Sequence, residues 1–182
     1  MSLILNTGLR LLAGLAVVLA CVGGSSLAHA QGEYSIKAAY LVNLLKFVSG
    51  LKASEPSPQM PMMLCVHGDD LFKDALGPVL KVRVQGRELQ ARNTRSIQEL
   101  DGCDVVYITR SEQKFTAQVL GAVGGRPVLT VSDMPEFIED GGMVGFTSSG
   151  NILRFRINLG AVRASGLDVS AKLLELALEV KS

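Results

Sequence analysis

The sequence predicts an α/β fold in three layers, built on a mostly parallel sheet with an antiparallel C-terminal hairpin and flanking N- and C-terminal helices. Three observations predict it. Between residues 62 and 131, short apolar runs alternate with segments of helical periodicity, which is typical of a parallel sheet covered by helices. The turn-rich stretch 147–151 separates two further strand-like runs and indicates a hairpin. Helical patterns at residues 33–49 and after Ser170 supply the flanking helices.

Length and composition limit the class of protein. The chain has 182 residues, of which 48% are hydrophobic and 19% charged, and it contains 6 Pro and 3 Cys. That length suits one domain. The composition excludes a disordered tail, a collagen-like repeat and a disulfide-dense mini-protein. We therefore expect one folded domain with a buried core.

The first thirty residues have the pattern of a secretory signal peptide. Arg10 is their only charge, an apolar run follows over 11–22, and Ala28-His29-Ala30 is a small-x-small cleavage pattern. The apolar run is too short for a membrane span of about 20 residues. We therefore expect cleavage after Ala30 and export of a single domain over residues 31–182 that does not itself span the membrane.

Removal of this leader changes both the charge and the cysteine count. The formal net charge of +1 falls to zero with the loss of Arg10. A neutral chain has no electrostatic footprint for nucleic acid and no basic run for an anionic membrane. Cys21 is also removed, which leaves Cys65 and Cys103. The competing interpretation is a lipoprotein acylated at Cys21. The bulky Leu19, two residues earlier, fits a lipoprotein signal poorly.

Residues 33–49 predict an amphipathic helix that ends near Gly50. Its apolar residues recur at helical spacing, and they form a stripe wider than a surface helix needs. The stripe consists of Ile36, Ala39, Tyr40, Leu44, Phe47, Val48 and Leu51, widened by Leu41, Val42 and Leu45. The helix is either deeply buried in the core of this domain or shared with a partner protein. Residues 50–61, with three Pro, are typical of an irregular connector.

The remaining elements follow from the same patterns. Strands are expected at 62–66, 88–94, 103–109 and 127–131, helices at 69–81 and 111–123, one helical turn at 96–101, and hairpin strands at 142–146 and 152–157. Asn158 can cap a short helix over 159–164. Ser170 can cap a last helix whose apolar face consists of Leu173, Leu174, Ala177 and Leu178.

The residues do not assemble a recognisable catalytic set. The first strand-to-helix turn has no glycine-rich phosphate motif, and its Asp69 and Asp70 are better explained as a helix cap and a favourable charge on the helix dipole. A phospho-receiver domain would need an Asp where this chain has Ile108-Thr109-Arg110. His67 is the only histidine of the mature chain, and no G-x-S-x-G occurs. We therefore expect no catalytic residue, no bound metal and no cofactor.

Cys65 and Cys103 are expected to form a disulfide. Cys65 lies in the first predicted strand, and Cys103 begins the strand that a doubly wound order places beside it, about 4.8 Å away. That spacing lies within the range of disulfide Cα separations, and exported thiols oxidise. The alternative is two buried free thiols that behave as small hydrophobes.

Six stretches of the chain, in order, resemble the YfiR family. They are I-K-A-A-Y at 36–40 with K-F-V at 46–48, L-C-V-H-G-D-D at 64–70, G-C-D-V-V-Y-I at 102–108, R-P-V-L-T-V-S-D at 126–133, G-G-M-V-G-F at 141–146 and F-R-I-N-L at 155–159. The stretches that carry cysteine are the most specific. The resemblance extends over nearly the whole of the predicted mature chain.

The resemblance implies a periplasmic protein that has no known catalysis and acts as a repressor. Members of the family bind the periplasmic sensing domain of an inner-membrane diguanylate cyclase and hold it inactive, which lowers cyclic-di-GMP output and biofilm formation. By position, Cys65 and Cys103 match the family's cysteine pair, which is linked to redox sensitivity. We therefore expect a homodimer, or a complex with such a sensor protein.

Two departures from the family pattern bear on the partner. The family commonly has Trp-Pro after K-F-V, where this chain has Ser49-Gly50, and often an acidic residue where this chain has Arg156. If the second hairpin strand touches the partner, the candidate contacts are Arg154, Arg156 and Asn158. The two arginines alternate with apolar residues and so share one face, for which a solvated edge is the other interpretation. A reversed charge on this strand requires a complementary change on the partner.

A periplasmic small-ligand-binding protein is the alternative function. In an open α/β sheet, ligands bind in the crevice at the carboxyl ends of the strands. The candidate crevice residues are His67, Thr109 and Ser132, which lie at the ends of three predicted strands. A hydrolase or an oxidoreductase is disfavoured because the chain offers no coherent catalytic set.

Overall fold

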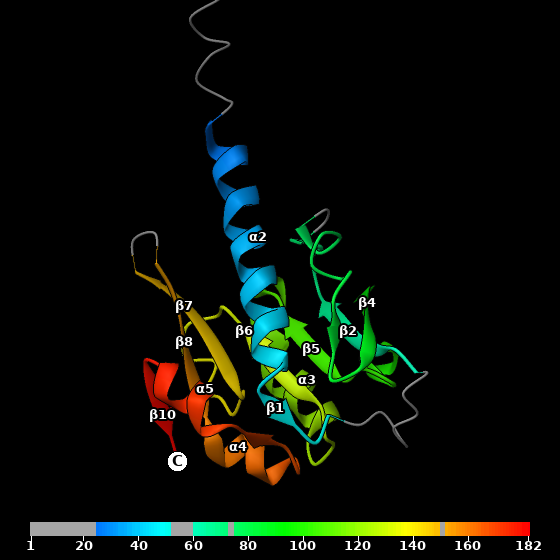
Figure 1. Cartoon of the computed structure of the whole chain (residues 1–182), viewed down its shortest axis with the longest axis vertical. Helices are drawn as coiled ribbons and strands as arrows, with labels where there is room; N and C mark the ends of the chain where they lie inside the picture. The colour runs from blue at the N-terminus through cyan, green and yellow to red at the C-terminus, as the bar shows by residue number, and fades with distance from the viewer. Residues whose placement is uncertain (1–24, 52–59, 73–74, 150–151) are drawn as a thin grey trace, which may run out of the picture.

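The computed structural model describes residues 25–51, 60–72, 75–149 and 152–182, and at its centre is a sheet of eight strands (Figure 1). The strands stand in the order β10-β8-β7-β6-β5-β2-β4-β3. Their bounds are β2 Met62–His67, β3 Arg83–Val84, β4 Arg87–Thr94, β5 Val105–Ile108, β6 Leu129–Ser132, β7 Val144–Ser149, β8 Ile152–Asn158 and β10 Glu179–Lys181. Neighbours are parallel except in the hairpin β7–β8 and the pair β3–β4. The predicted mostly parallel sheet with an antiparallel hairpin is confirmed.

Helices cover both faces of the sheet, so the predicted three layers are also confirmed. The first core packs under α2 (Ser25–Leu45), α4 (Leu159–Ala164) and α5 (Ala171–Leu176), and the second under α3 (Thr116–Val123) and the 3-10 helix Ile97–Leu100. The alternation of side chains along β5 shows the division. Val105 and Tyr107 belong to the first core, whereas Val106 and Ile108 belong to the second.

The first helix begins earlier and ends earlier than predicted. α2 includes the expected cleavage site after Ala30, and its N-terminal part stands clear of the sheet (Figure 1). It stops at Leu45 because the chain turns and Val48–Ser49 (β1) pairs with Asp168–Val169 (β9) in a second, two-stranded sheet. The predicted signal peptide lies mostly outside the described residues. Across the described part of the chain, none of the helices has the length and apolarity needed to cross a membrane.

The burial of residues along α2 supports the first alternative, a helix packed into the core of this domain. Its buried residues are Ala38, Leu41, Val42, Leu44 and Leu45, joined by Lys37. Ile36 and Tyr40, which also belong to the predicted stripe, are exposed instead. The helix therefore buries one side against the sheet and leaves the opposite side open.

The prediction of a helix at 69–81 is wrong for the described part of that segment. Residues 69–72 and 75–81 form bends, turns and a single 3-10 residue, without α-helix. Gly77-Pro78 explains the difference, because proline lacks an N–H donor and clashes with the carbonyl four residues earlier. Phe72 and Leu76 instead anchor the loop in the first core.

The two predicted C-terminal helices are present, whereas β7 extends to Ser149, into the stretch predicted as the hairpin loop, and β9 was not predicted. Asn158 Oδ1 accepts a hydrogen bond from the Ala161 N–H at 3.0 Å and caps α4, and Ser170 Oγ accepts one from the Leu173 N–H at 3.3 Å and caps α5. The chain then forms the unpredicted strand β10, so Leu178 leaves the predicted helix face. The helix predicted at 111–123 is likewise divided into the 3-10 helix Arg110–Phe115 and α3.

A buried ion pair fixes the amino edge of the sheet. Arg87 donates to both carboxylate oxygens of Asp104, at 3.0 and 2.9 Å. It also donates to the main-chain oxygens of Leu51, Met60 and Pro61, at 3.4, 3.1 and 2.8 Å. One guanidinium therefore ties β4 to the start of β5 and to both ends of the connector.

Candidate functional site

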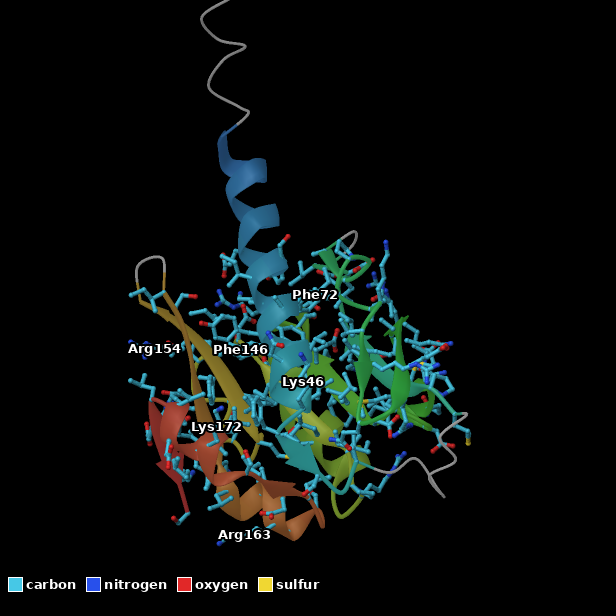
Figure 2. All side chains as sticks on the ribbon, in the orientation of Figure 1. Lys46, Phe72, Phe146, Arg154, Arg163 and Lys172 are labelled. Carbon is cyan, nitrogen blue, oxygen red and sulfur yellow. A yellow bond between two sulfur atoms is a disulfide. The ribbon has the colours of Figure 1, made fainter. Side chains whose placement is uncertain are left out.

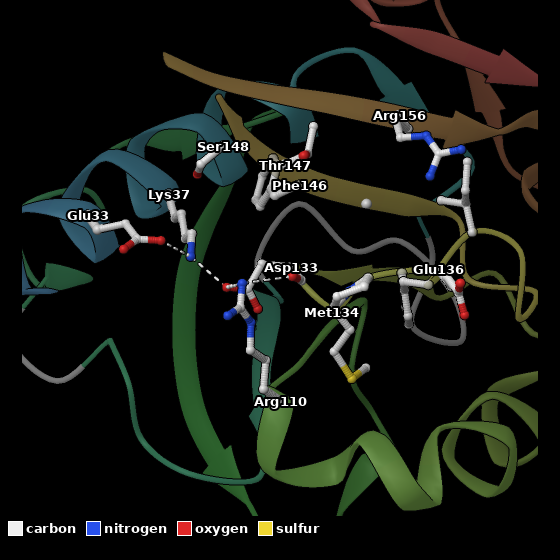
Figure 3. Close-up of a pocket in the computed structure, with 14 residues that line it drawn as sticks. Glu33, Lys37, Arg110, Asp133, Met134, Glu136, Phe146, Thr147, Ser148 and Arg156 are labelled. Atoms are coloured by element: carbon white, nitrogen blue, oxygen red, sulfur yellow. Dashed lines mark hydrogen bonds and ion pairs between the residues drawn. The ribbon is translucent and has the colours of Figure 1, made fainter. Parts of the chain in front are cut away.

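The candidate functional site is a groove at the carboxyl edge of the parallel sheet. It lies between α2, the segment after β6, and the hairpin β7–β8, with a cavity volume of about 280 Å³ (Figure 3). We call it the α2–hairpin groove. Its charged lining residues are Glu33, Lys37, Arg110, Asp133, Glu136 and Arg156. The wall between them is mixed, with Phe146, Thr147 and Ser148 from β7.

Unequal strand lengths create this groove. β6 ends at Ser132 and pairs with β7 only at its first two residues, Val144 and Gly145. β7 and β8 continue as a pair as far as Ser149 and Ile152, so the hairpin projects beyond the end of β6 (Figure 1). The chain turns away after β6 and leaves one side of the projecting hairpin open to the groove.

Lys37 and Asp133 join α2 to the sheet at one end of the groove. Lys37 Nζ donates to Asp133 Oδ2 at 2.6 Å and lies 2.6 Å from Glu33 Oε1, one helical turn earlier (Figure 3). The Lys37 and Asp133 side chains are only 2% and 3% exposed. Arg110 Nη2 lies 3.3 Å from the same Asp133 oxygen and donates to the Asp133 main-chain oxygen at 3.2 Å. The buried charges are therefore paired, as burial requires.

The surroundings of Lys37 keep it positively charged. Burial lowers its pKa, but hydrogen bonds to Asp133 and Glu33 outweigh burial, so the pKa is raised. The Tyr34 ring adds a cation–π contact, with its centroid 4.6 Å from Lys37 Nζ. Burial, followed by the charge of Asp133, raises the pKa of Tyr107 and keeps its phenol neutral. The Tyr107 hydroxyl and Asp133 Oδ1 are both buried without a hydrogen-bond partner among the described residues.

Arg156 closes the other end of the groove. Its guanidinium donates to Glu139 at 2.5 Å and to Glu179 of β10 at 2.8 Å. These hydrogen bonds raise the pKa of Arg156, and the one to Glu139 lowers the pKa of that carboxyl. Arg156 therefore links its own strand β8 to β10 and to the segment that follows β6. The two carboxylates pair with its charge.

The three predicted partner contacts have different surroundings. Arg154 is exposed at the outer margin of the hairpin (Figure 2). Arg156 lines the groove and is engaged by carboxylates, while Asn158 is buried, caps α4 and donates to the Ile138 main-chain oxygen at 2.9 Å. A partner contact at any of them stays a prediction. Exposure favours Arg154 among the three.

The three predicted crevice residues lie at neighbouring strand ends and are buried. The Thr109 hydroxyl donates to the His67 main-chain oxygen at 3.0 Å, and the Ser132 hydroxyl donates to the main chain of β5 at 2.7 Å. His67 Nδ1 lies 3.0 Å from the Thr94 hydroxyl. Gly68 packs so closely that an added Cβ would lie 2.2 Å from Thr109 Oγ1. Thr109 therefore packs closely against Gly68, whereas His67 lines a second cavity of about 320 Å³ together with Arg95 and Glu112. A ligand role for the three predicted residues stays a prediction.

The predicted disulfide between Cys65 and Cys103 is present, with the two Cα atoms 6.0 Å apart. Both cysteines are buried in the second core, on the face of the sheet opposite α2. Arg92 of β4 lies beside both sulfur atoms, with Nε 3.5 Å from Cys65 Sγ and Nη2 3.7 Å from Cys103 Sγ. The disulfide therefore couples β2 to the start of β5 under a guanidinium.

Lys37, Arg110 and Asp133 were not among the predicted site residues. One signal was available, because Lys37 lies among the apolar residues of the first helix, and a lysine is almost never buried without a partner. The partner could not be named, since Asp133 is 96 residues away and no sequence spacing connects them. Their contact depends on the strand order, which brings the end of β6 under α2.

The fold and the groove define a class of protein, an α/β domain with a candidate site at the carboxyl edge of its sheet. Within the described ranges, no three His, Cys, Asp or Glu side chains come together to hold a metal ion. The chain belongs to the YfiR/HmsC-like family, whose model matches residues 34–178. This confirms the resemblance seen in the sequence. Members of that family are periplasmic regulatory proteins, and membership supports such a role here.

Solved structures share the fold at low sequence identity. A conserved domain protein from Vibrio cholerae has a TM-score of 0.53 and 11% identity, over 81% of this chain and 60% of that one. The ABC domain of a Streptococcus protein in complex with L-Trp has a TM-score of 0.53 and 12% identity, over 79% of this chain and 61% of that one. This chain thus spans about three-fifths of the length of each. At such identities the likeness shows the fold alone.

Proposed function

We propose that this protein binds the periplasmic sensing domain of an inner-membrane diguanylate cyclase and represses it, lowering cyclic-di-GMP signalling and biofilm formation. The observation that carries the proposal is the match of the YfiR/HmsC-like family model to residues 34–178. The protein acts by contact and contributes no catalytic step. Its partner is therefore recognised through shape and charge at its surface.

The α2–hairpin groove is the surface that we propose for this contact. Its walls are held at both ends, by Lys37 with Asp133 and by Arg156 with Glu139. A preset shape reduces the ordering cost of binding. Arg154 pairs in register with Thr147, a lining residue of the groove, and so extends the surface onto the hairpin.

Affinity capture from solubilised membranes tests the proposal. The tagged protein is expected to recover an inner-membrane protein that has a diguanylate cyclase domain and a periplasmic domain. Arg154→Glu is expected to reduce that recovery several-fold, because it reverses an exposed charge beside the groove. Lys114→Glu, a matched reversal on the exposed 3-10 helix Arg110–Phe115, leaves recovery unchanged.

The outcomes separate the function from the surface. Recovery of no such membrane protein, with and without reductant, contradicts the repressor proposal. Equal recovery by the Arg154→Glu variant contradicts the groove and hairpin as the contact surface and leaves the repressor proposal standing.

Capture of a small ligand is the second candidate function. The observation that favours it is the buried Asp133 carboxylate in a groove at the carboxyl edge of the sheet, where α/β proteins bind ligands. Thermal unfolding with L-tryptophan, the ligand named for the similar Streptococcus domain, gives a first test. A melting temperature that rises with ligand concentration supports capture, and an unchanged one counts against this ligand class.

A further inference from the structure

We infer that the cavity beside His67 binds a small organic cation, a primary amine on an apolar body. The cavity has a volume of about 320 Å³. It lies at the carboxyl end of β2 and is lined by the 3-10 helices Ile97–Leu100 and Arg110–Phe115 and by α3. We call it the His67 cavity. Among the described residues it shares none with the α2–hairpin groove, so the two are separate sites.

His67 offers a hydrogen-bond acceptor to this cavity. The residue is 2% exposed, and burial lowers its pKa, so the ring is neutral at neutral pH. Its Nδ1 lies 3.0 Å from the Thr94 hydroxyl, which itself donates to the Val66 main-chain oxygen at 3.4 Å. Because a hydroxyl has one proton to give, Nδ1 carries the ring proton and Nε2 is the acceptor. Within the described ranges the ring forms its hydrogen bond at Nδ1, which leaves Nε2 available to a ligand donor.

A carboxylate and an aromatic ring reach the cavity from the same helix. Glu112 and Phe115 both line it and are three residues apart in a 3-10 helix. Such residues project from the same side, because this helix has three residues per turn. Glu112 also packs beside the end of β2, since a Cβ added at Gly68 would lie 2.9 Å from Glu112 Cγ. An ammonium group can therefore pair with the carboxylate and contact the face of the Phe115 ring.

The charges around the cavity favour a cation over an anion. Arg95 is the lining cation, and its guanidinium lies 3.3 Å from Asp69 Oδ1, so its charge is paired. Glu99 accepts the main-chain N–H of Arg95 at 2.6 Å and remains negative. Glu112 and Glu99 both act on His67 in the direction that favours a positive charge. A cation in the cavity therefore meets a negative potential, whereas an anion is repelled.

The rest of the lining suits the body of a small molecule. A volume of about 320 Å³ lies at the lower end of the range for small-ligand pockets. Ile97, Val119 and the Phe115 ring supply apolar contacts, and the amides of Gln98 and Gln118 can hydrogen-bond to polar substituents. Phe115 is 54% exposed, so the cavity opens to solvent. We therefore expect weak, reversible binding of the amine.

Titration of the isotope-labelled protein with phenethylamine, followed by amide NMR spectra, tests the inference. This probe joins one primary ammonium group to one aromatic ring. Millimolar concentrations are expected to shift the signals of residues 95–98 and of the Gln98 and Gln118 side-chain amides. Phenethyl alcohol is a neutral molecule of similar shape, and hydrocinnamate is an anion of similar size. Both are expected to bind at least about fivefold more weakly than the amine.

Two variants test the assigned contacts. Glu112→Gln removes the charge at constant size, and Phe115→Ala removes the ring. Each is expected to raise the Kd for phenethylamine by about fivefold. Glu175→Gln makes the matched change at an exposed position of α5, outside the cavity lining, and leaves the Kd unchanged. Unaltered signals away from the cavity show that each variant is folded.

Several results would overturn the inference. One is phenethylamine that shifts no signals at the His67 cavity, or only those of the α2–hairpin groove. Another is phenethyl alcohol or hydrocinnamate that binds as tightly as the amine, which would show that the charge is not recognised. The last is a folded Glu112→Gln variant with the Kd of the unchanged protein.

Discussion

Lys37 is the residue that connects the first helix to the groove. It is a buried cation on a helix whose other buried residues, such as Leu41 and Leu45, are apolar. Its hydrogen bond to Asp133 fixes where α2 crosses the end of β6. A methionine would pack as well against the sheet, so the charge has a positional role that packing alone does not explain.

Lys37→Met is expected to lower the free energy of unfolding by about 3–5 kcal/mol, because it leaves the Asp133 carboxylate buried with Arg110 alone. The double variant Lys37→Met with Asp133→Asn removes both charges and is expected to lose much less. Urea unfolding of the two variants measures the difference. A double variant as unstable as the single one would show that buried charge is not the cause.

His67 makes stability depend on pH in mild acid. Burial lowers its pKa, against the smaller opposite effects of Glu112 and Glu99. The unfolded chain therefore binds a proton at His67 more readily than the folded chain does. The contribution of His67 to the free energy of unfolding is full above the unfolded pKa of about 6.5 and is lost as the pH falls through the folded pKa. Carboxylates such as Glu139, whose pKa is lowered, change the stability only below about pH 4.5.

His67→Gln is expected to remove the loss of stability between about pH 6.5 and about pH 4.5, since glutamine does not titrate. Its amide can still hydrogen-bond to the Thr94 hydroxyl. Urea unfolding of both proteins across this range measures the two slopes. Parallel slopes for the variant and the unchanged protein would rule out His67 as the titrating group.

At the scale of elements, the disulfide joins strands that the sheet already places side by side. Cys65 and Cys103 are 38 residues apart, and closing a loop of this length stabilises a protein by about 4 kcal/mol in the chain-entropy model. Replacing both by alanine is expected to cost about that much in the free energy of unfolding. The same protein in reductant provides an independent comparison. A loss below about 1 kcal/mol would mean that the bond adds little beyond packing.

Elements specified by local signals were predictable from the sequence. The Asn158 cap, the hairpin and β4 follow from a side-chain acceptor, a turn composition and an alternation that each lie within a few residues. The segment 69–81 failed because its apolar spacing was given more weight than Gly77-Pro78. β10 was missed because its pairing with β8 is a tertiary contact, which overrides the helical pattern that Leu178 appeared to continue.

The candidate site was less predictable than the fold for the same physical reason. A parallel sheet brings the ends of strands together in an order that sequence patterns do not specify. The groove further depends on the extra length of the hairpin beyond β6. Of the three residues predicted at the strand ends, His67 lines a cavity beside Arg95 and Glu112, whereas the α2–hairpin groove opens beside β6 and β7. A ligand role for His67, Thr109 and Ser132 stays a prediction.

Across the whole molecule, the groove lies at the carboxyl edge of the sheet and β10 lies at a lateral edge (Figure 1). Arg156 contacts both, through the groove lining and through Glu179. The remaining rigid contacts, the disulfide and the Arg87–Asp104 pair, lie away from the groove and hold the sheet itself.

The proposed function requires that this protein restrain cyclic-di-GMP synthesis from the periplasm. Intracellular cyclic-di-GMP, measured by mass spectrometry with and without the gene, tests it most directly. Deletion of the gene is expected to raise cyclic-di-GMP several-fold, and the full chain, but not a chain that lacks residues 1–30, is expected to reverse the rise. Cyclic-di-GMP that is unchanged by deletion, or restored equally by the leaderless chain, would contradict it.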